Sequence, residues 1–208
     1  MAVIKSGATA DLLTIDPISK AARVTLYDTT GRETSPQSKA TYAAASTFTP
    51  AATPTDMITI HGSATKNVRV VSVFVTTTTT AAGSIQLYLA KRSTADSGGV
   101  FVPATMVPLD STDAAATANV GHWTTNPTLG TLVGNTNIVR IATPVAVPAT
   151  FAGIVEDAGK ELMPWMANSL LDKPVTLRGV AQALAVHFAG AALVAGQTHA
   201  YRVVWTED

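Results

Sequence analysis

The four histidines are the first residues to test for chemistry, because an imidazole can bind a metal or move a proton near neutral pH. They are His61, His122, His187 and His199, and no two of them have HxH, HxxxH or HExxH spacing. His187 and His199 could meet if their strands are neighbours, and a carboxylate could then complete a metal site. Histidines scattered over strands are more often hydrogen-bonded structural residues, so we predict no metal and no cofactor.

Carboxylates are few, and they give two close groupings: Asp110 with Asp113, and Glu156 with Asp157. Paired acids in a cleft can hydrolyse glycosidic bonds, but an Asp in a turn usually caps the backbone through its side chain. The chain also has no cysteine, no GxSxG nucleophile elbow and no glycine-rich phosphate loop. The sequence therefore predicts no catalytic residue, and we expect a protein that is not an enzyme.

The three tryptophans are candidates for stacking on sugar rings. We expect Trp123 and Trp205 to lie in the core, because large apolar side chains are usually buried. Trp165 lies in the apolar run from Met163 to Met166, inside an expected loop. It could cover one end of the fold or contact a partner.

The overall composition limits the class of protein. Among 208 residues, basic and acidic side chains number 14 each, so the formal net charge is zero, which argues against a nucleic-acid partner. Only 13% of residues are charged while 47% are hydrophobic, which suggests a surface partly covered by partners, although a low-charge monomer is the alternative. No apolar run is long enough for a transmembrane helix or a signal peptide, so we expect no membrane partner and synthesis in a cytoplasm.

Strands must position these residues, and the stretch from Met57 to Arg92 shows the pattern best. Its apolar residues recur at every second position, and Val71, Val73 and Val75 are predicted to share a buried face opposite a wet face. The same spacing continues to the C-terminus, where Tyr201, Val203 and Trp205 share one face of a strand inside a sheet. One short helix is expected, from Asp157 to Met163. The sequence predicts an all-β, antiparallel, jelly-roll-like β-sandwich with an extended N-terminal arm.

Three segments are expected along the chain. Residues 1–34 contain two short apolar runs and form an assembly arm, or alternatively an edge hairpin on the chain's own sandwich. Residues 35–55 are rich in Ser, Thr, Ala and Pro and form a linker, and residues 56–208 form the sandwich. The residues predicted to contact a partner are Leu12, Leu13, Ile15, Val24, Leu26, Tyr27 and Trp165.

Several stretches resemble a widespread set of tailed-bacteriophage and prophage proteins. They are IHGSATKNVRVVSVFVTTTTTAAGSIQLYLAKRSTADSGG at 60–99, the segments Pro108 to Ala116 and Thr124 to Gly134, and the end, LRGVAQALAVHFAG and YRVVWTED. The opening, IKSGATADLLTIDPISKAARVTLYDTTGRE at 4–33, is similar to the N-terminal segment of the same proteins. This resemblance covers most of the chain and brings no catalytic residues with it.

The resemblance implies a structural part of a tailed-phage virion, made in the cytoplasm of a bacterial host. We expect a capsid decoration or cement protein, or a head–tail accessory protein, anchored through its N-terminal arm. Its partners would be other virion proteins, capsid or tail subunits, and copies of itself, with a homotrimer favoured by analogy with phage accessory proteins. The alternative is a receptor- or glycan-binding tail module, with Trp165 or Trp123 in its binding groove.

Overall fold

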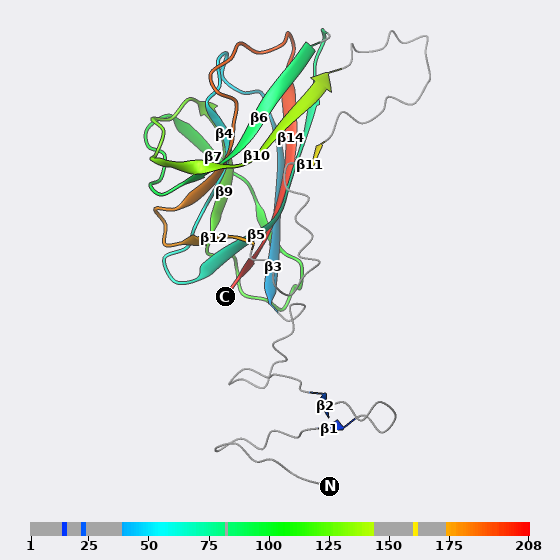
Figure 1. The fold of residues 1–208 in the computed structure, drawn as a ribbon, viewed down its shortest axis with the longest axis vertical. Helices are drawn as coiled ribbons and strands as arrows, with labels where there is room; N and C mark the ends of the chain where they lie inside the picture. Colours follow the sequence, from blue (N-terminus) through cyan, green and yellow to red (C-terminus); the bar gives the residue numbers. More distant parts are fainter. Residues whose placement is uncertain (1–13, 16–21, 24–38, 82, 144–159, 162–173) are drawn as a thin grey trace, which may run out of the picture. The chain divides into compact units, whose positions relative to one another are not determined.

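The structure, a computed structural model, describes residues 14–15, 22–23, 39–81, 83–143, 160–161 and 174–208 (Figure 1). The chain divides into two units, Met1–Lys39 and Ala40–Asp208. In the first unit, β1 (Thr14–Ile15) pairs antiparallel with β2 (Ala22–Arg23). These two strands lie inside the two apolar runs that the sequence singled out.

The second unit is an all-β sandwich of two antiparallel sheets, which confirms the predicted fold class. The first sheet has the order β10 (Leu132–Thr143), β6 (Gly83–Arg92), β13 (Ala183–His187), β4 (Asp56–His61), β9 (Asn119–Thr125), β7 (Val100–Pro103). The second has the order β11 (Lys160–Glu161), β5 (Asn67–Thr78), β14 (Thr198–Glu207), β3 (Ala40–Phe48), β8 (Met106–Pro108), and β12 (Val175–Arg178) also pairs with β5.

The strand order is that of a jelly roll. One layer contains β3-β14-β5-β12 and the other contains β4-β13-β6-β10. The pair β3–β14 in the first layer thus corresponds to the pair β4–β13 in the second, and the pair β14–β5 corresponds to β13–β6. Strands β3, β5 and β14 belong to the second sheet and β4, β6 and β13 to the first, so the connections from β3 to β4, from β5 to β6 and from β13 to β14 all cross between the sheets. Two consecutive Greek keys have this connectivity. Strands β7, β8 and β9 extend the two sheets at the β3–β4 side.

The core lies between the sheets and is built from the inward rows of both. Strand β14 lies between β3 and β5, so the chain's last strand is central, as predicted. Tyr201, Val203 and Trp205 are 3%, 1% and 0% exposed, respectively, and share the buried face. Facing them from the other sheet are residues such as Ile58 on β4 and Leu184 on β13.

A bulge in β5 makes one predicted row wrong. Val204 pairs with Ser72 and Trp205 with Val70, which leaves Val71 as an extra residue in β5. An extra residue exchanges the two faces of a strand from that point on. Val70 therefore joins Val73 and Val75 in the core, and Val71 is only half-buried.

The predicted wet face is wrong for the middle of the first sheet. Thr59 and Ala185 are fully buried, although they lie on the face opposite the core residues Ile60 and Leu184. Trp123 Nε1 donates a hydrogen bond of 2.9 Å to Thr59 Oγ1, which satisfies that hydroxyl. The outer face of this sheet is therefore shielded from solvent at its centre. The small side chains of Thr59 and Ala185 leave room for neighbouring groups such as the Trp123 ring to lie over it.

The predicted linker at 35–55 is also corrected, because β3 begins at Ala40. This strand pairs with β14 along its whole length, and its side chains Tyr42 and Phe48 are buried. The helix expected from Asp157 to Met163 is contradicted at Lys160–Glu161, which pair with β5 as strand β11. Among the segments described, none is a helix with the length and apolar character needed to cross a bilayer.

Candidate functional site

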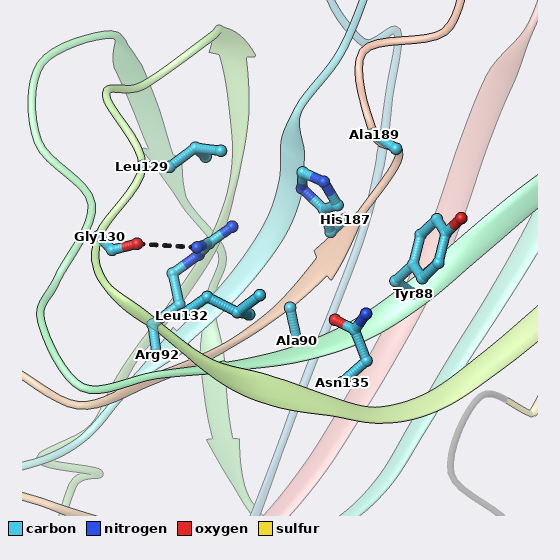
Figure 2. A pocket seen from close by; sticks show the side chains of 9 residues that line it. All are labelled: Tyr88, Ala90, Arg92, Leu129, Gly130, Leu132, Asn135, His187 and Ala189. Carbon is cyan, nitrogen blue, oxygen red and sulfur yellow. Dashed lines mark hydrogen bonds between the residues drawn. The ribbon is translucent and has the colours of Figure 1, made fainter.

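A hollow of about 380 Å³ opens on the outer face of the first sheet. Figure 2 shows its lining: Tyr88, Ala90 and Arg92 from β6, Leu129, Gly130, Leu132 and Asn135 from β10 and the loop before it, and His187 and Ala189 at the end of β13. The alternation along β6 explains the lining, because Leu87 and Leu89 point into the core and Tyr88 and Ala90 point outward.

Arg92, which lines this hollow, forms an ion pair with Asp56 that connects β6 to β4 across β13. Arg92 at the end of β6 donates from Nε to Asp56 Oδ2 at 2.5 Å and from Nη2 to Asp56 Oδ1 at 2.7 Å. Asp56 begins β4, and His187 on β13 between them donates from Nδ1 to Asp56 Oδ1 at 2.7 Å. Both charged side chains of the ion pair are almost wholly buried. Burial alone would raise the pKa of Asp56, but the hydrogen bonds from Arg92 and His187 lower it below its ordinary value.

The loop wall of the hollow is fastened to the same ion pair. Arg92 Nη1 donates to the carbonyl of Gly130 at 2.8 Å, and the Gly130 amide donates to Asp96 Oδ1 at 2.8 Å. A β-carbon on Gly130 would lie 2.0 Å from the carbonyl oxygen of Thr94, so only glycine fits here. The chain from Ser93 to Gly99 and the chain around Gly130 are thus held together over the sheet.

Asp96 carries the second carboxylate of this cluster, and one of its oxygens is unsatisfied. Asp96 Oδ2 is buried and makes no hydrogen bond. Burial and the nearby charge of Asp56 raise the pKa of Asp96 to about 6. The Arg92 guanidinium, 3.4 Å away, opposes that rise only in part. Protonated on Oδ2, Asp96 is a hydrogen-bond donor whose neighbouring acceptor is the carboxylate of Asp56.

His187 connects this cluster to the hollow. Its Nδ1 is held by Asp56, while its side chain remains 20% exposed. Because an ionised carboxylate only accepts, the neutral ring carries its proton on Nδ1 and leaves Nε2 as an acceptor. Nε2 has no hydrogen-bond partner among the described residues.

Four backbone irregularities lie around the hollow. Strand β10 has two register shifts against β6, at Leu132/Gly134 and at Asn135/Asn137, and β13 has one against β4 at Val186/His187. Ala189 has a φ of +63°, and it is the one non-glycine residue with a positive φ among the described residues. Bulges and strained residues often re-aim side chains at functional sites, and here they present Asn135, His187 and Ala189 to one space.

The other three histidines are separate and structural. His187 and His199 do not meet, because β13 and β14 belong to different sheets. Gln197 Nε2 donates to His199 Nε2, and His199 Nδ1 donates to Thr77 Oγ1, both at 2.8 Å; burial lowers the pKa of His199 to about 4. His122 stacks on Phe48, and His61 contacts Phe101 edge-on. The described residues contain no group of three His, Asp or Glu side chains arranged to hold a metal.

Of the aromatic and acidic residues singled out in the sequence, some lie in the core, one caps a turn and three lie outside the described residues. Trp123 and Trp205 are buried at 6% and 0%, which confirms their placement in the core and removes Trp123 as a sugar platform. Asp110 caps a turn by accepting from the amide and hydroxyl of Thr112, as expected. Glu156, Asp157 and Trp165 lie outside the described residues.

Of the arm residues predicted to contact a partner, Ile15 alone lies among the described residues. Ile15 lies in β1, where it pairs with Ala22. The others, Leu12, Leu13, Val24, Leu26 and Tyr27, lie outside the described residues, so their role in partner contact stays a prediction.

The lining of the hollow suits binding better than nucleophilic chemistry. The His187–Asp56 pair has the geometry of a base and the group that orients it. However, the lining residues include no Ser, Thr or Cys that such a base could activate. They supply an imidazole acceptor, an amide, a phenol and an apolar wall.

Comparisons of the chain with protein-family models, with curated proteins and with solved structures found no match. The strand order of the structure defines the class of the protein as a jelly-roll β-sandwich.

Proposed function

We propose that the protein is a structural component of a tailed-phage virion. In this proposal it is a capsid decoration or cement protein, or a head–tail accessory protein, and residues 1–39 anchor the sandwich to its neighbours. The sequence resemblance is the origin of the proposal. Fold alone does not define a role, because jelly rolls serve many functions.

The observation that best supports association is the apolar character of the sheet edges. Strands β7, β8 and β10 each pair with a single neighbour among the described strands, so each has a free edge. Six large apolar side chains on these strands are more than a third exposed: Val100, Val102, Val107, Leu132, Val133 and Ile138. Unprotected edges with apolar side chains are suited to contact with another chain.

The proposal also includes self-association as a homotrimer. Light scattering on the full-length protein should then give three times the mass of one chain. A monomer at micromolar concentration would contradict the trimer, while leaving anchoring through residues 1–39 to be tested separately.

The decisive experiment removes the first unit and follows assembly. A chain of residues 40–208 should give the same far-ultraviolet circular dichroism per residue as the sandwich of the full chain, yet should not join virions when supplied in place of the full chain. The control is the full-length protein expressed at the same level. Normal incorporation of the shortened protein into particles would refute the anchoring role.

A further inference from the structure

The hollow over β6, β10 and β13 has the chemistry of a ligand site, and of the edge residues in the assembly proposal it includes only Leu132. Its volume of about 380 Å³ lies in the lower part of the range of roughly 300–1,000 Å³ found for small-molecule sites. It has one apolar side, from Ala90, Leu129 and Leu132, and three separate polar groups. A ligand that fits should therefore have an apolar face and several polar groups on its rim.

The polar groups of the hollow determine whether a ligand must donate or accept hydrogen bonds. The Asp56 contact places a proton on His187 Nδ1, and in the neutral form of the ring Nε2 is then the acceptor. An ionised carboxylate has no hydrogen to give to such an acceptor, whereas every hydroxyl group has one. The guanidinium of Arg92 is already engaged by Asp56 and by Gly130, so it is not a free anion receptor. The lining therefore favours a neutral ligand with hydroxyl donors.

Asn135 and Tyr88 complete the set. The Asn135 side chain is exposed, makes no hydrogen bond within the described part of the chain and can both donate and accept. The Tyr88 phenol accepts from Gln86 Nε2 at 2.6 Å, which holds its ring in place. Figure 2 shows Tyr88, Asn135 and His187 reaching the same space from β6, β10 and β13. An aromatic ring beside an amide suits a sugar, which has a C–H face and hydroxyl groups around it.

We propose that this hollow, bounded by Tyr88, Leu132, Asn135 and His187, binds a single neutral pyranose unit. The Asp56–Arg92 pair acts in positioning, because it fixes the tautomer and direction of His187. The sugar's hydroxyl groups meet His187 Nε2 and the Asn135 amide, and its apolar face lies against Tyr88 and Leu132. No bond is made or broken.

The test is titration of the full-length protein with methyl pyranosides of glucose, galactose, mannose and N-acetylglucosamine, followed by ¹H–¹⁵N correlation spectra. The sugars should be added up to about 50 mM, because a single open site is expected to bind with roughly millimolar affinity. At least one sugar should shift the amides near Tyr88, Asn135 and His187. Asn135→Ala and Leu132→Ala should each weaken that binding by about tenfold.

The matched control is Leu109→Ala, since Leu109 is 57% exposed and Leu132 is 53% exposed, but Leu109 follows β8 in the other sheet. This control should bind the sugar like the wild type. The site is refuted if none of the four sugars shifts these amides, or if both hollow variants bind as well as the control. Tighter binding of sodium acetate or inorganic phosphate in the hollow would also overturn the assignment. Virion incorporation is measured independently, so failure here leaves the assembly proposal standing.

Discussion

At the scale of single residues, Asp96 is the side chain whose ionisation should be visible in the stability of the protein. Its pKa is about 6 in the folded chain and about 3.9 in an unfolded one. A raised pKa means that the folded state holds the proton more tightly. The stabilising contribution is therefore complete below about pH 4 and is lost as the pH rises through 6.

We predict that Asp96→Asn removes this loss. The amide oxygen can still accept from Gly130, and the amide nitrogen can donate to Asp56 in place of the acid proton. The variant should be more stable than the wild type by about 1–3 kcal/mol at pH 8 and nearly equal to it at pH 4. Urea unfolding at pH 4, 6 and 8 measures the difference. A difference that does not change with pH would contradict the assignment.

The pKa of Glu207 is shifted in the opposite direction to that of Asp96. Its carboxylate accepts from the amides of Thr117 and Ala118 at 2.9 Å, from the Thr117 hydroxyl at 2.6 Å and from Trp205 Nε1 at 3.0 Å. Burial alone would raise the pKa of Glu207, but these hydrogen bonds lower it. The contribution is therefore present above the ordinary glutamate pKa and is lost as the pH falls through the lower folded value.

Glu207→Gln should cost about 1–3 kcal/mol of unfolding free energy at pH 7, because an amide nitrogen would face backbone donors. Its cost should shrink as the pH falls below about 4, where the wild-type carboxylate is also neutralised. The matched control is Asp208→Asn, which weakens an exposed pair with Arg69 and should cost less than about 1 kcal/mol. Equal costs for the two neighbouring variants would contradict the role of Glu207 in holding the backbone at Thr117 and Ala118, just before β9.

The candidate site itself could not be read from the sequence. Asp56 and His187 are 131 positions apart, and only the neighbouring positions of β4 and β13 bring them together. The one local signal was the alternation in β6, where Tyr88 lies between the buried Leu87 and Leu89. The histidine pair that was considered, His187 with His199, failed because alternation gives the face of a residue but not the sheet to which its strand belongs.

At the scale of elements, strands with strong alternation were predictable and weakly apolar ones were not. The rows in β6, β13 and β14 consist of Leu, Val, Tyr and Trp, which are large enough to mark a buried face. Strand β3 also alternates, with Tyr42, Ala44 and Phe48 buried, but alanine is a poor strand former and prolines follow closely. At the bulge the alternate valines change phase, from Val68 and Val70 to Val71, Val73 and Val75, but this pattern does not say whether Val70 or Val71 faces the core.

The central position of β14 leads to a prediction at this scale. Deleting Ala200 to Asp208 removes a strand that pairs with both β3 and β5 and buries Trp205 completely. The two neighbours would then have unpaired backbone groups facing the core, which is far more costly than one lost side chain. We expect no soluble protein from the truncated gene. Soluble protein with an unchanged melting temperature would contradict this placement.

At the scale of the whole molecule, the boundary between the two units decides what each can do alone. Residues 40–208 contain both sheets and all of the described core, whereas a chain that begins at Asp56 lacks β3. Without β3, β14 loses one neighbour, β8 loses its only described partner, and the core loses Tyr42 and Phe48. The loss of two such aromatic side chains alone is worth several kcal/mol, comparable to the total stability of a domain.

We therefore predict opposite outcomes for two truncations that differ by only a short segment. The chain 40–208 should unfold at the same urea concentration as the sandwich in the full-length protein, because its sheets and core are complete. The chain 56–208 should be insoluble or lack a cooperative transition. Equal, cooperative unfolding of both chains would mean that β3 is dispensable, and would restore a linker that extends to residue 55. A destabilised 40–208 chain would mean instead that residues 1–39 stabilise the sandwich, and the anchoring experiment would then need a variant that unfolds only the first unit.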